Sequence, residues 1–173
     1  MVKRVRVGLG NLKSVVAYLE TYKTKMKLNN HTFVERLTKD AEVTLREKVN
    51  RTNAGLELYP FPYLKPTDLF VPDAEIEDNK GVVIMEGEDA TFVEFGAGVS
   101  LNGHLGSSPH PRGAELGMTI GDYGKGYGQY TSWGYKDIDG LHVTRGVKSQ
   151  KPLYETLLET KGKVGEIAKE VWK

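Results

Sequence analysis

The sequence has no cysteine, and none of its apolar runs approaches the roughly eighteen residues that a membrane-spanning helix requires. Without cysteine there can be no disulfide framework, no thiolate metal site and no cysteine nucleophile. The first four residues lead into no apolar core of a signal peptide. Because 173 residues also fit one domain, we expect a single soluble domain over residues 1–173, made inside the cell.

Motifs for phosphate or nucleotide binding are missing as well. Three glycine strings, at residues 8–10, 96–98 and 124–128, invite a phosphate-loop interpretation. None of them has the Gly-Lys-Ser/Thr ending of a Walker loop, or the third glycine and following helix of a dinucleotide fingerprint. We therefore expect no nucleotide cofactor.

The four histidines lack the spacing of a catalytic zinc site, which takes three protein ligands on rigid elements. Only His104 and His110 are close in sequence, with Asp122 beyond them. We expect both histidines to be exposed loop residues, and we expect the chain to hold no metal and to be no enzyme. A small hydrolase that uses these three residues is the weaker alternative.

The net charge of +1 conceals a strong polarity along the chain. Residues 1–51 carry twelve Lys and Arg against five Asp and Glu, whereas residues 52–100 carry two against ten. This pattern fits basic-to-acidic docking, either of helices on a sheet or of one subunit on another. It also allows an alternative function, a nucleic-acid-binding module that uses Lys3, Arg4, Arg6 and the basic N-terminal helices.

Apolar residues recur at spacings of three and four in the first third of the chain, which predicts amphipathic helices. The first helix follows Asn11 as its N-cap, and the second begins at a capping box, residues 32–35. Asn29 and Asn30 form the predicted break between them. One long helix through this break is the alternative that the pattern leaves open. The helical part spans residues 1–51.

Runs of β-branched and aromatic residues follow, which predict a sheet over residues 52–150. Residues 82–85 and 90–95 are expected to form one hairpin, and residues 130–135 and 141–144 a second. Together the two hairpins predict a roughly four-stranded antiparallel sheet.

Ten of the twenty glycines fall within residues 96–128. A long segment of low structural propensity is usually functional or ordered by a partner, so we expect an extended arm over residues 97–128. This arm should stay mobile until a neighbouring subunit contacts it. A closing helix over residues 152–172 has Pro152 in its first turn. Helices, then strands, then a helix, without βαβ alternation, predict an α+β fold.

Residues at the base of the predicted arm are candidates for a subunit interface. Glu94 is an acid inside an apolar run, and we expect it to face solvent or to pair with Arg145. Aromatic side chains often anchor interfaces, because they bring a large contact area at low entropic cost. The candidate interface residues are Val93, Glu94, Phe95, Gly96, Tyr123, Tyr127, Trp133, Tyr135 and Arg145.

Four short pieces occur in order over residues 90–173: Ala90-Thr91-Phe92-Val93-Glu94-Phe95-Gly96, Trp133-Gly134-Tyr135, Thr144-Arg145-Gly146 and Lys151-Pro152-Leu153-Tyr154. In order and in kind, they resemble the small neck or tail-component proteins of long-tailed double-stranded DNA bacteriophages. The resemblance implies a non-enzymatic ring, a hexamer or dodecamer, that joins head to tail (tail completion) beside other neck and tail proteins. It also implies synthesis in the host bacterial cytoplasm, a place in the virion, non-specific contact with genomic DNA in the lumen and no membrane contact.

Overall fold

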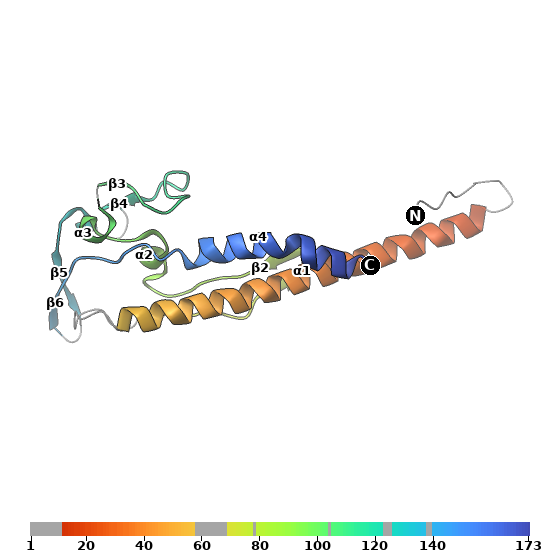
Figure 1. The fold of residues 1–173 in the computed structure, drawn as a ribbon, viewed down its shortest axis with the longest axis horizontal. Coiled ribbons are helices and arrows are strands. Elements are labelled where there is room, and N and C mark those ends of the chain that lie inside the picture. The colour runs from red at the N-terminus through yellow and green to blue at the C-terminus, as the bar shows by residue number, and fades with distance from the viewer. Residues whose placement is uncertain (1–11, 58–68, 78, 104, 123–125, 138–139) are drawn as a thin grey trace.

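The computed structural model describes residues 12–57, 69–77, 79–103, 105–122, 126–137 and 140–173. Predictions on the following residues lie outside that part of the chain: Lys3, Arg4, Arg6, residues 8–10, the N-cap Asn11, His104 and Tyr123. A long helix, α1 (Leu12–Glu57), runs along the molecule, and α4 (Pro152–Val171) lies beside it (Figure 1). Most of the other elements gather around the C-terminal end of α1 and the start of α4.

Between the two long helices the chain forms short strands and short helices. Three antiparallel pairs are present: β1 (Glu75–Glu77) with β2 (Lys80–Val82), β3 (Gly106–Ser107) with β4 (Thr119–Ile120), and β5 (Trp133–Asp137) with β6 (Gly140–Thr144). The short helices are α2 (Ala90–Phe95), α3 (Val99–Asn102) and the 3-10 turn η2 (Tyr127–Gln129). The described chain is therefore mixed helix and antiparallel sheet, in general agreement with the α+β prediction.

The predicted break between two N-terminal helices is wrong, because α1 continues through Asn29 and Asn30. This is the alternative of one long helix that the sequence pattern left open. Asparagine lowers helix propensity by well under 1 kcal/mol, far less than glycine or proline, so packing decides the outcome. The side chain of Asn30 donates a hydrogen bond to Asn79, which fixes the β1–β2 turn beside the helix.

The four-stranded sheet is also wrong, since the described residues form three separate two-stranded pairs. The second predicted hairpin is confirmed as β5 and β6, in which Trp133 lies opposite Thr144. The first is wrong because residues 90–95 are helix α2, not a strand. Strand propensity mainly reflects packing on a half-buried surface. Here the helical conformation places both Val93 and Glu94 in the interior.

Helix α4 packs antiparallel along α1. The contacts that mark this seam are, in order, Lys48 Nζ to Glu159 Oε1 at 2.6 Å, Asp40 Oδ1 to Lys163 Nζ at 2.9 Å, Arg36 to Glu170, and the rings of Phe33 and Trp172 with centroids 5.1 Å apart. The apolar core beneath the seam consists of Leu45, Val49, Leu69, Val71, Met85 and Val93. Because the seam ends at Phe33, the earlier residues of α1 project beyond α4 (Figure 1).

One ion pair across the seam should make stability depend on pH. The hydrogen bond with Lys48 lowers the pKa of Glu159, and the same bond raises the pKa of Lys48. The lowered carboxyl pKa contributes stability at neutral pH that is lost as the pH falls through the folded-state value. The raised lysine pKa contributes stability that is lost only as the pH rises through its folded-state value, far above neutrality.

We therefore expect Lys48→Met to lower the urea midpoint slightly at neutral pH and to have a smaller effect toward about pH 3. The effect is small because Glu159 is half-exposed and solvent screens the pair. Urea unfolding followed by circular dichroism at both pH values measures it. Equal shifts at both pH values would contradict this explanation.

The Gly-rich segment is not an extended arm over its described residues. It contains α3, β3, β4 and η2, and its start is held by the bridge between Ala97 and Val147. Further along, the hydroxyl of Ser108 donates to the carbonyl of Phe95 at the end of α2. Glycines with positive φ, such as Gly98 at 80° and Gly103 at 89°, allow the tight turns on either side of α3. Over its described residues the segment therefore folds back on its own chain.

Within the described part of the chain, neither α1, α4 nor any shorter helix is apolar enough over sufficient length to span a membrane.

Candidate functional site

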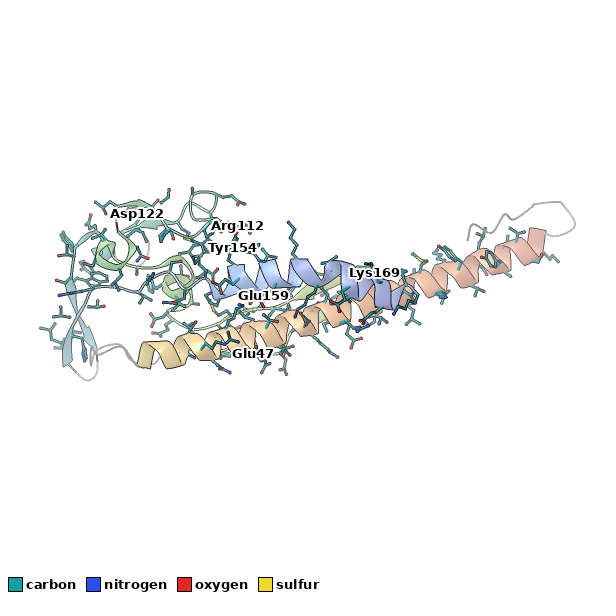
Figure 2. The ribbon with its side chains drawn as sticks, in the orientation of Figure 1. Glu47, Arg112, Asp122, Tyr154, Glu159 and Lys169 are labelled. Atoms are coloured by element: carbon teal, nitrogen blue, oxygen red, sulfur yellow. The ribbon has the colours of Figure 1, made fainter. Side chains whose placement is uncertain are left out.

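An open groove with a volume of about 320 Å³ lies between α2, the start of α4 and the loop at residues 108–118. Its apolar walls come mainly from Met85, Phe95, Leu116, Leu153, Tyr154 and Leu157. Figure 2 shows Arg112 and Tyr154 close together above the first turns of α4, where the loop meets the helix. We call this feature the α2–α4 groove.

Glu94 lies in the floor of the groove and caps helix α4 from a distance. Its Oε2 accepts the backbone N–H of Leu153 and its Oε1 accepts that of Tyr154, both at 2.9 Å. The first N–H groups of a helix have no partner within the helix. The local N-cap residue, Lys151, supplies no side-chain bond and adopts a left-handed conformation with φ of 60°. The carboxylate therefore takes the place of a local cap, and its negative charge also suits the positive end of the helix dipole.

His110 is the second polar group in the floor of the groove. Only 5% of it is exposed, so the prediction of an exposed loop histidine is wrong. Its Nδ1 accepts the backbone N–H of Arg112 at 3.0 Å, which requires a lone pair on that nitrogen. The proton therefore lies on Nε2, which donates to Glu94 Oε1 at 2.9 Å. The rings of Phe95 and Tyr154 pack against the imidazole, with centroids 4.6 and 5.1 Å away.

Asn102 joins the groove to the strands beyond it. Its amide nitrogen lies 3.1 Å from the carbonyl oxygen of Ala97, 3.0 Å from that of Gly98 and 2.9 Å from that of Val147. Its Oδ1 accepts the backbone N–H of Ser149 at 3.1 Å, and the Ser149 hydroxyl donates to the carbonyl of Glu94 at 2.7 Å. Buried polar groups that are fully paired hold a structure in one arrangement.

The expected ion pair of Glu94 with Arg145 is not what the structure contains. The carboxylate is 4% exposed and is bonded by α4 and His110, so its expected exposure to solvent is also wrong. The reason is geometric, because the α2 helix turns Glu94 inward and α4 presents free N–H groups there.

The structure spreads the other candidate interface residues over several surroundings. Val93 is fully buried in the core, Phe95 lines the groove, and Gly96 has φ of 85° beside the Asn102 amide. Tyr127 is half-exposed in η2. On the β5 side, Trp133 lies against Gly98, while Tyr135 lies in β5 and Arg145 follows β6.

Of the three residues of the hydrolase alternative, the two that the structure describes, His110 and Asp122, are not brought together. His110 follows β3, whereas Asp122 follows β4, so these two residues lie beyond opposite ends of an antiparallel pair. Figure 2 likewise shows Asp122 well away from Arg112, which follows His110 by two residues in the same loop. His104 lies outside the described residues. The described part of the chain contains no group of three or more His, Asp or Glu side chains placed to hold a metal ion.

Sequence reasoning missed the polar residues that hold the groove together. Asn102, Ser108 and Ser149 are all buried, although serine and asparagine are mostly exposed in proteins. In a Gly-rich stretch these residue types are ordinary turn residues, and no periodicity marks them. An available signal was Gly103, because a glycine directly after Asn102 suggested a short helix ending there.

Comparisons with protein-family models, with curated proteins and with solved structures found no match for this chain.

Glu94 and His110 bond each other and nearby backbone N–H groups, so they are suited to fixing the groove. On its rim, Arg112 makes two bonds to the carboxylate of Glu115, at 3.0 and 2.7 Å. These bonds raise the pKa of Arg112 and lower the pKa of Glu115, so both groups stay charged at neutral pH. The groove thus combines an ordered floor, apolar walls and a charged rim, an arrangement suited to receiving an amphipathic side-chain surface.

The bridge at the start of the Gly-rich segment requires glycine at position 146. Gly146 has φ of 92°, and a Cβ there would meet the carbonyl oxygen of Ala97, which accepts the N–H of Val147. We expect Gly146→Ala to lower the free energy of unfolding by about 2–3 kcal/mol, through strain and the lost bridge.

Gly103→Ala is the matched control, since Gly103 has φ of 89° but nothing within 4 Å of an added Cβ. It should cost only the backbone strain, about 1 kcal/mol. Thermal and urea unfolding of the two variants measure the difference. Equal losses would mean that the clash with Ala97 does not matter.

Proposed function

We propose that this chain is a structural virion protein of a tailed phage or prophage. In this proposal it is a ring component of the neck or tail that completes the tail and joins it to the head. It acts through subunit contacts and has no enzymatic activity. Its partners are further copies of itself, in a hexameric or dodecameric ring, and the adjacent neck and tail proteins. Non-specific contact with genomic DNA in the lumen belongs to the same proposal.

The observation that carries the proposal is the exposed end of α1. Every side chain from Val16 to Leu28 is exposed, and large apolar residues among them are 40–64% accessible. Across the described residues, eighteen large hydrophobic side chains are exposed and eight hydrophobic residues are buried. Extended apolar surfaces of this kind mark interaction sites. Assembly stabilises a subunit of this kind, because contact with a neighbour removes the apolar surface from water.

The resemblance of residues 90–173 to phage neck and tail-component proteins is the reason for proposing that the assembly is a phage neck or tail. The pieces that carry the resemblance surround the groove or support it. Residues 90–96 form α2 and its end, and residues 151–154 form the capped start of α4. In a ring subunit, these segments would hold the contact surface in one fixed shape.

Immunogold electron microscopy tests the proposal directly. The chain would carry an epitope tag in the virus or prophage that encodes it, and purified particles would be labelled. Gold at the head–tail junction is the expected result, and removal of the gene should leave filled heads and free tails. Complete, infectious particles without the gene product, or gold away from the junction, would overturn the proposal.

The nucleic-acid alternative draws on one feature of the same helix end. Lys13, Lys23, Lys25 and Lys27 are exposed there against a single acid, Glu20. A DNA-binding module should retain duplex DNA at about 200 mM salt, with an affinity that falls steeply as salt is added. Weak binding that disappears at this salt concentration would fit passive contact in a ring lumen instead.

A further inference from the structure

We propose that the projecting end of α1, residues 12–28, docks in the α2–α4 groove of a second copy of this chain. The inference deepens the proposed function and rests on it, since it names the contact that would join neighbouring ring subunits. It replaces the Gly-rich segment, which folds on its own chain, with a helix as the linking element.

The side chains of residues 16–28 in the projecting end are all exposed, because this part of α1 lies beyond the seam with α4. The seam with α4 ends at the contact of Phe33 with Trp172, and the β1–β2 turn reaches only as far as Asn30. At a rise of 1.5 Å per residue, the seventeen residues before that point extend for about 25 Å. Such a helix is marginal in water by itself and gains stability when its apolar face is covered.

One face of the projecting end is apolar and its flanks are basic. Val16, Leu19, Tyr22 and Met26 follow the spacing of three and four that places side chains on one face, and they are 46%, 56%, 54% and 40% exposed. Thr21 and Thr24 lie on the other face, where their hydroxyls bond backbone carbonyls of the same helix. Four lysines and one glutamate give the projecting end a charge of +3.

The groove offers the complementary surface. Leu116 and Leu157 line it and are 45% and 51% exposed. Met85 and Ala90 line the groove as well, and the turn that joins them in sequence carries the exposed acids Glu86, Glu88 and Asp89. The groove is therefore apolar, with the Arg112–Glu115 ion pair on its rim and three acids on the adjoining turn, opposite in sign to the lysines that flank the helix face. Complementary charges of this kind guide docking and fix its orientation.

The docking must be between copies. The projecting end leaves the molecule beyond the C-terminal end of α4, whereas the groove lies at the start of α4, where Figure 2 places Arg112 and Tyr154. The continuous helix cannot fold back on its own groove. A contact of one copy's helix with another copy's groove is head-to-tail, and such contacts form rings when the rotation closes.

The apolar face supplies about half of a typical interface. Half-exposed large apolar side chains each cover on the order of 100 Å², so the four side chains of the face would bury roughly 400 Å² per partner, against a typical value of about 800 Å², and the stems of the flanking lysines would add to this area. Pairing of two projecting ends with each other is disfavoured, because it would bring eight lysines together against two glutamates. The groove, beside its acidic turn, is the better partner for the same helix face.

Light scattering over a concentration series tests the helix face in the full chain. The variant Leu19→Gln/Tyr22→Gln keeps helix-forming residues but removes the apolar face, and self-association should weaken by roughly 30-fold or more. The matched control Thr21→Gln/Thr24→Gln, on the other face, should associate as the unchanged protein does. The inference would be overturned if the unchanged protein is monomeric at every concentration, or if the two variants self-associate equally.

Disulfide trapping tests the groove. Because the native sequence has no cysteine, only the introduced cysteines can form cross-links. Met26→Cys and Leu116→Cys are made as two separate variants with different tags and mixed under mild oxidation. A cross-link that joins the two tags, in clear excess over links between like tags, is expected. Links formed only between two Met26→Cys chains would show pairing of the projecting ends and would overturn the inference.

Charge exchange between the helix and the groove tests the docking mode independently of the cross-link. Lys25→Glu/Lys27→Glu should weaken association with unchanged grooves, and mixing with Glu86→Lys/Glu88→Lys should restore it. Failure to restore would overturn the docking mode. Discrete rings that persist without the helix-to-groove cross-link would leave the proposed virion role standing and remove this contact alone. Conversely, gold labelling away from the head–tail junction would remove the virion role but not the contact.

Discussion

Replacing Glu94 by alanine is expected to lower the free energy of unfolding by about 4 kcal/mol, a large part of the stability of a typical domain. The carboxylate accepts the backbone N–H groups of Leu153 and Tyr154 and the Nε2–H of His110. Without it, three donors lose their acceptor in a site that is 4% exposed at Glu94. Each unsatisfied buried donor costs about 1–3 kcal/mol.

Urea unfolding measures the loss, and hydrogen exchange at the start of α4 locates it. Glu94→Gln keeps the shape but has only one acceptor oxygen, so its loss should be intermediate, about 2 kcal/mol. Glu166→Ala, an exposed acid on α4, is the control and should change stability by less than about 0.5 kcal/mol. Similar losses for Glu94→Ala and the control would show that the carboxylate does not cap the helix.

Asn102→Asp is expected to be about equally damaging, at roughly 4 kcal/mol, although the two side chains have the same shape. The amide nitrogen lies within 3.1 Å of the carbonyl oxygens of Ala97, Gly98 and Val147. A carboxylate would place a buried negative charge against three carbonyl dipoles and would remove the donor they share. Only 8% of Asn102 is exposed, so solvent cannot relieve the repulsion.

The matched control is Asn79→Asp, because Asn79 is exposed and its oxygen accepts from Asn30, a role that a carboxylate can also fill. Its effect should be within about 0.5 kcal/mol. Thermal unfolding of both variants at neutral pH makes the comparison. Comparable melting temperatures for the two variants would mean that the amide network at Asn102 contributes little.

The features that sequence could predict are those set by local rules. Pro152 at the first turn and an apolar stripe predicted the closing helix, and α4 follows that prediction at Pro152–Val171. Two runs of β-branched and aromatic residues joined by a turn predicted the β5–β6 pair. Both depend on residues close in sequence.

The features that sequence could not predict depend on distant partners. The run at residues 90–95 has strand-like composition, yet it becomes helical because Val93 and Glu94 both find buried partners in that conformation. The pairing of Glu94 with α4 joins residues almost sixty positions apart, and no local pattern marks it. Similarly, glycine content predicted an extended arm over residues 97–128, whereas buried Asn102 links that segment to Val147 and Ser149, and buried His110 links it to Glu94 of α2 and Tyr154 of α4.

The projecting helix also has a mechanical consequence. A rigid rod anchored at one end acts as a lever, so a small change of angle at the anchor becomes a larger displacement at the tip. With about 25 Å of projecting helix, a tilt of about 5° at the seam moves the tip by about 2 Å, comparable to the fit of one side chain in a pocket. Residues that set this angle, such as Arg36 with Glu170, would tune the curvature of an assembly without touching a neighbouring subunit.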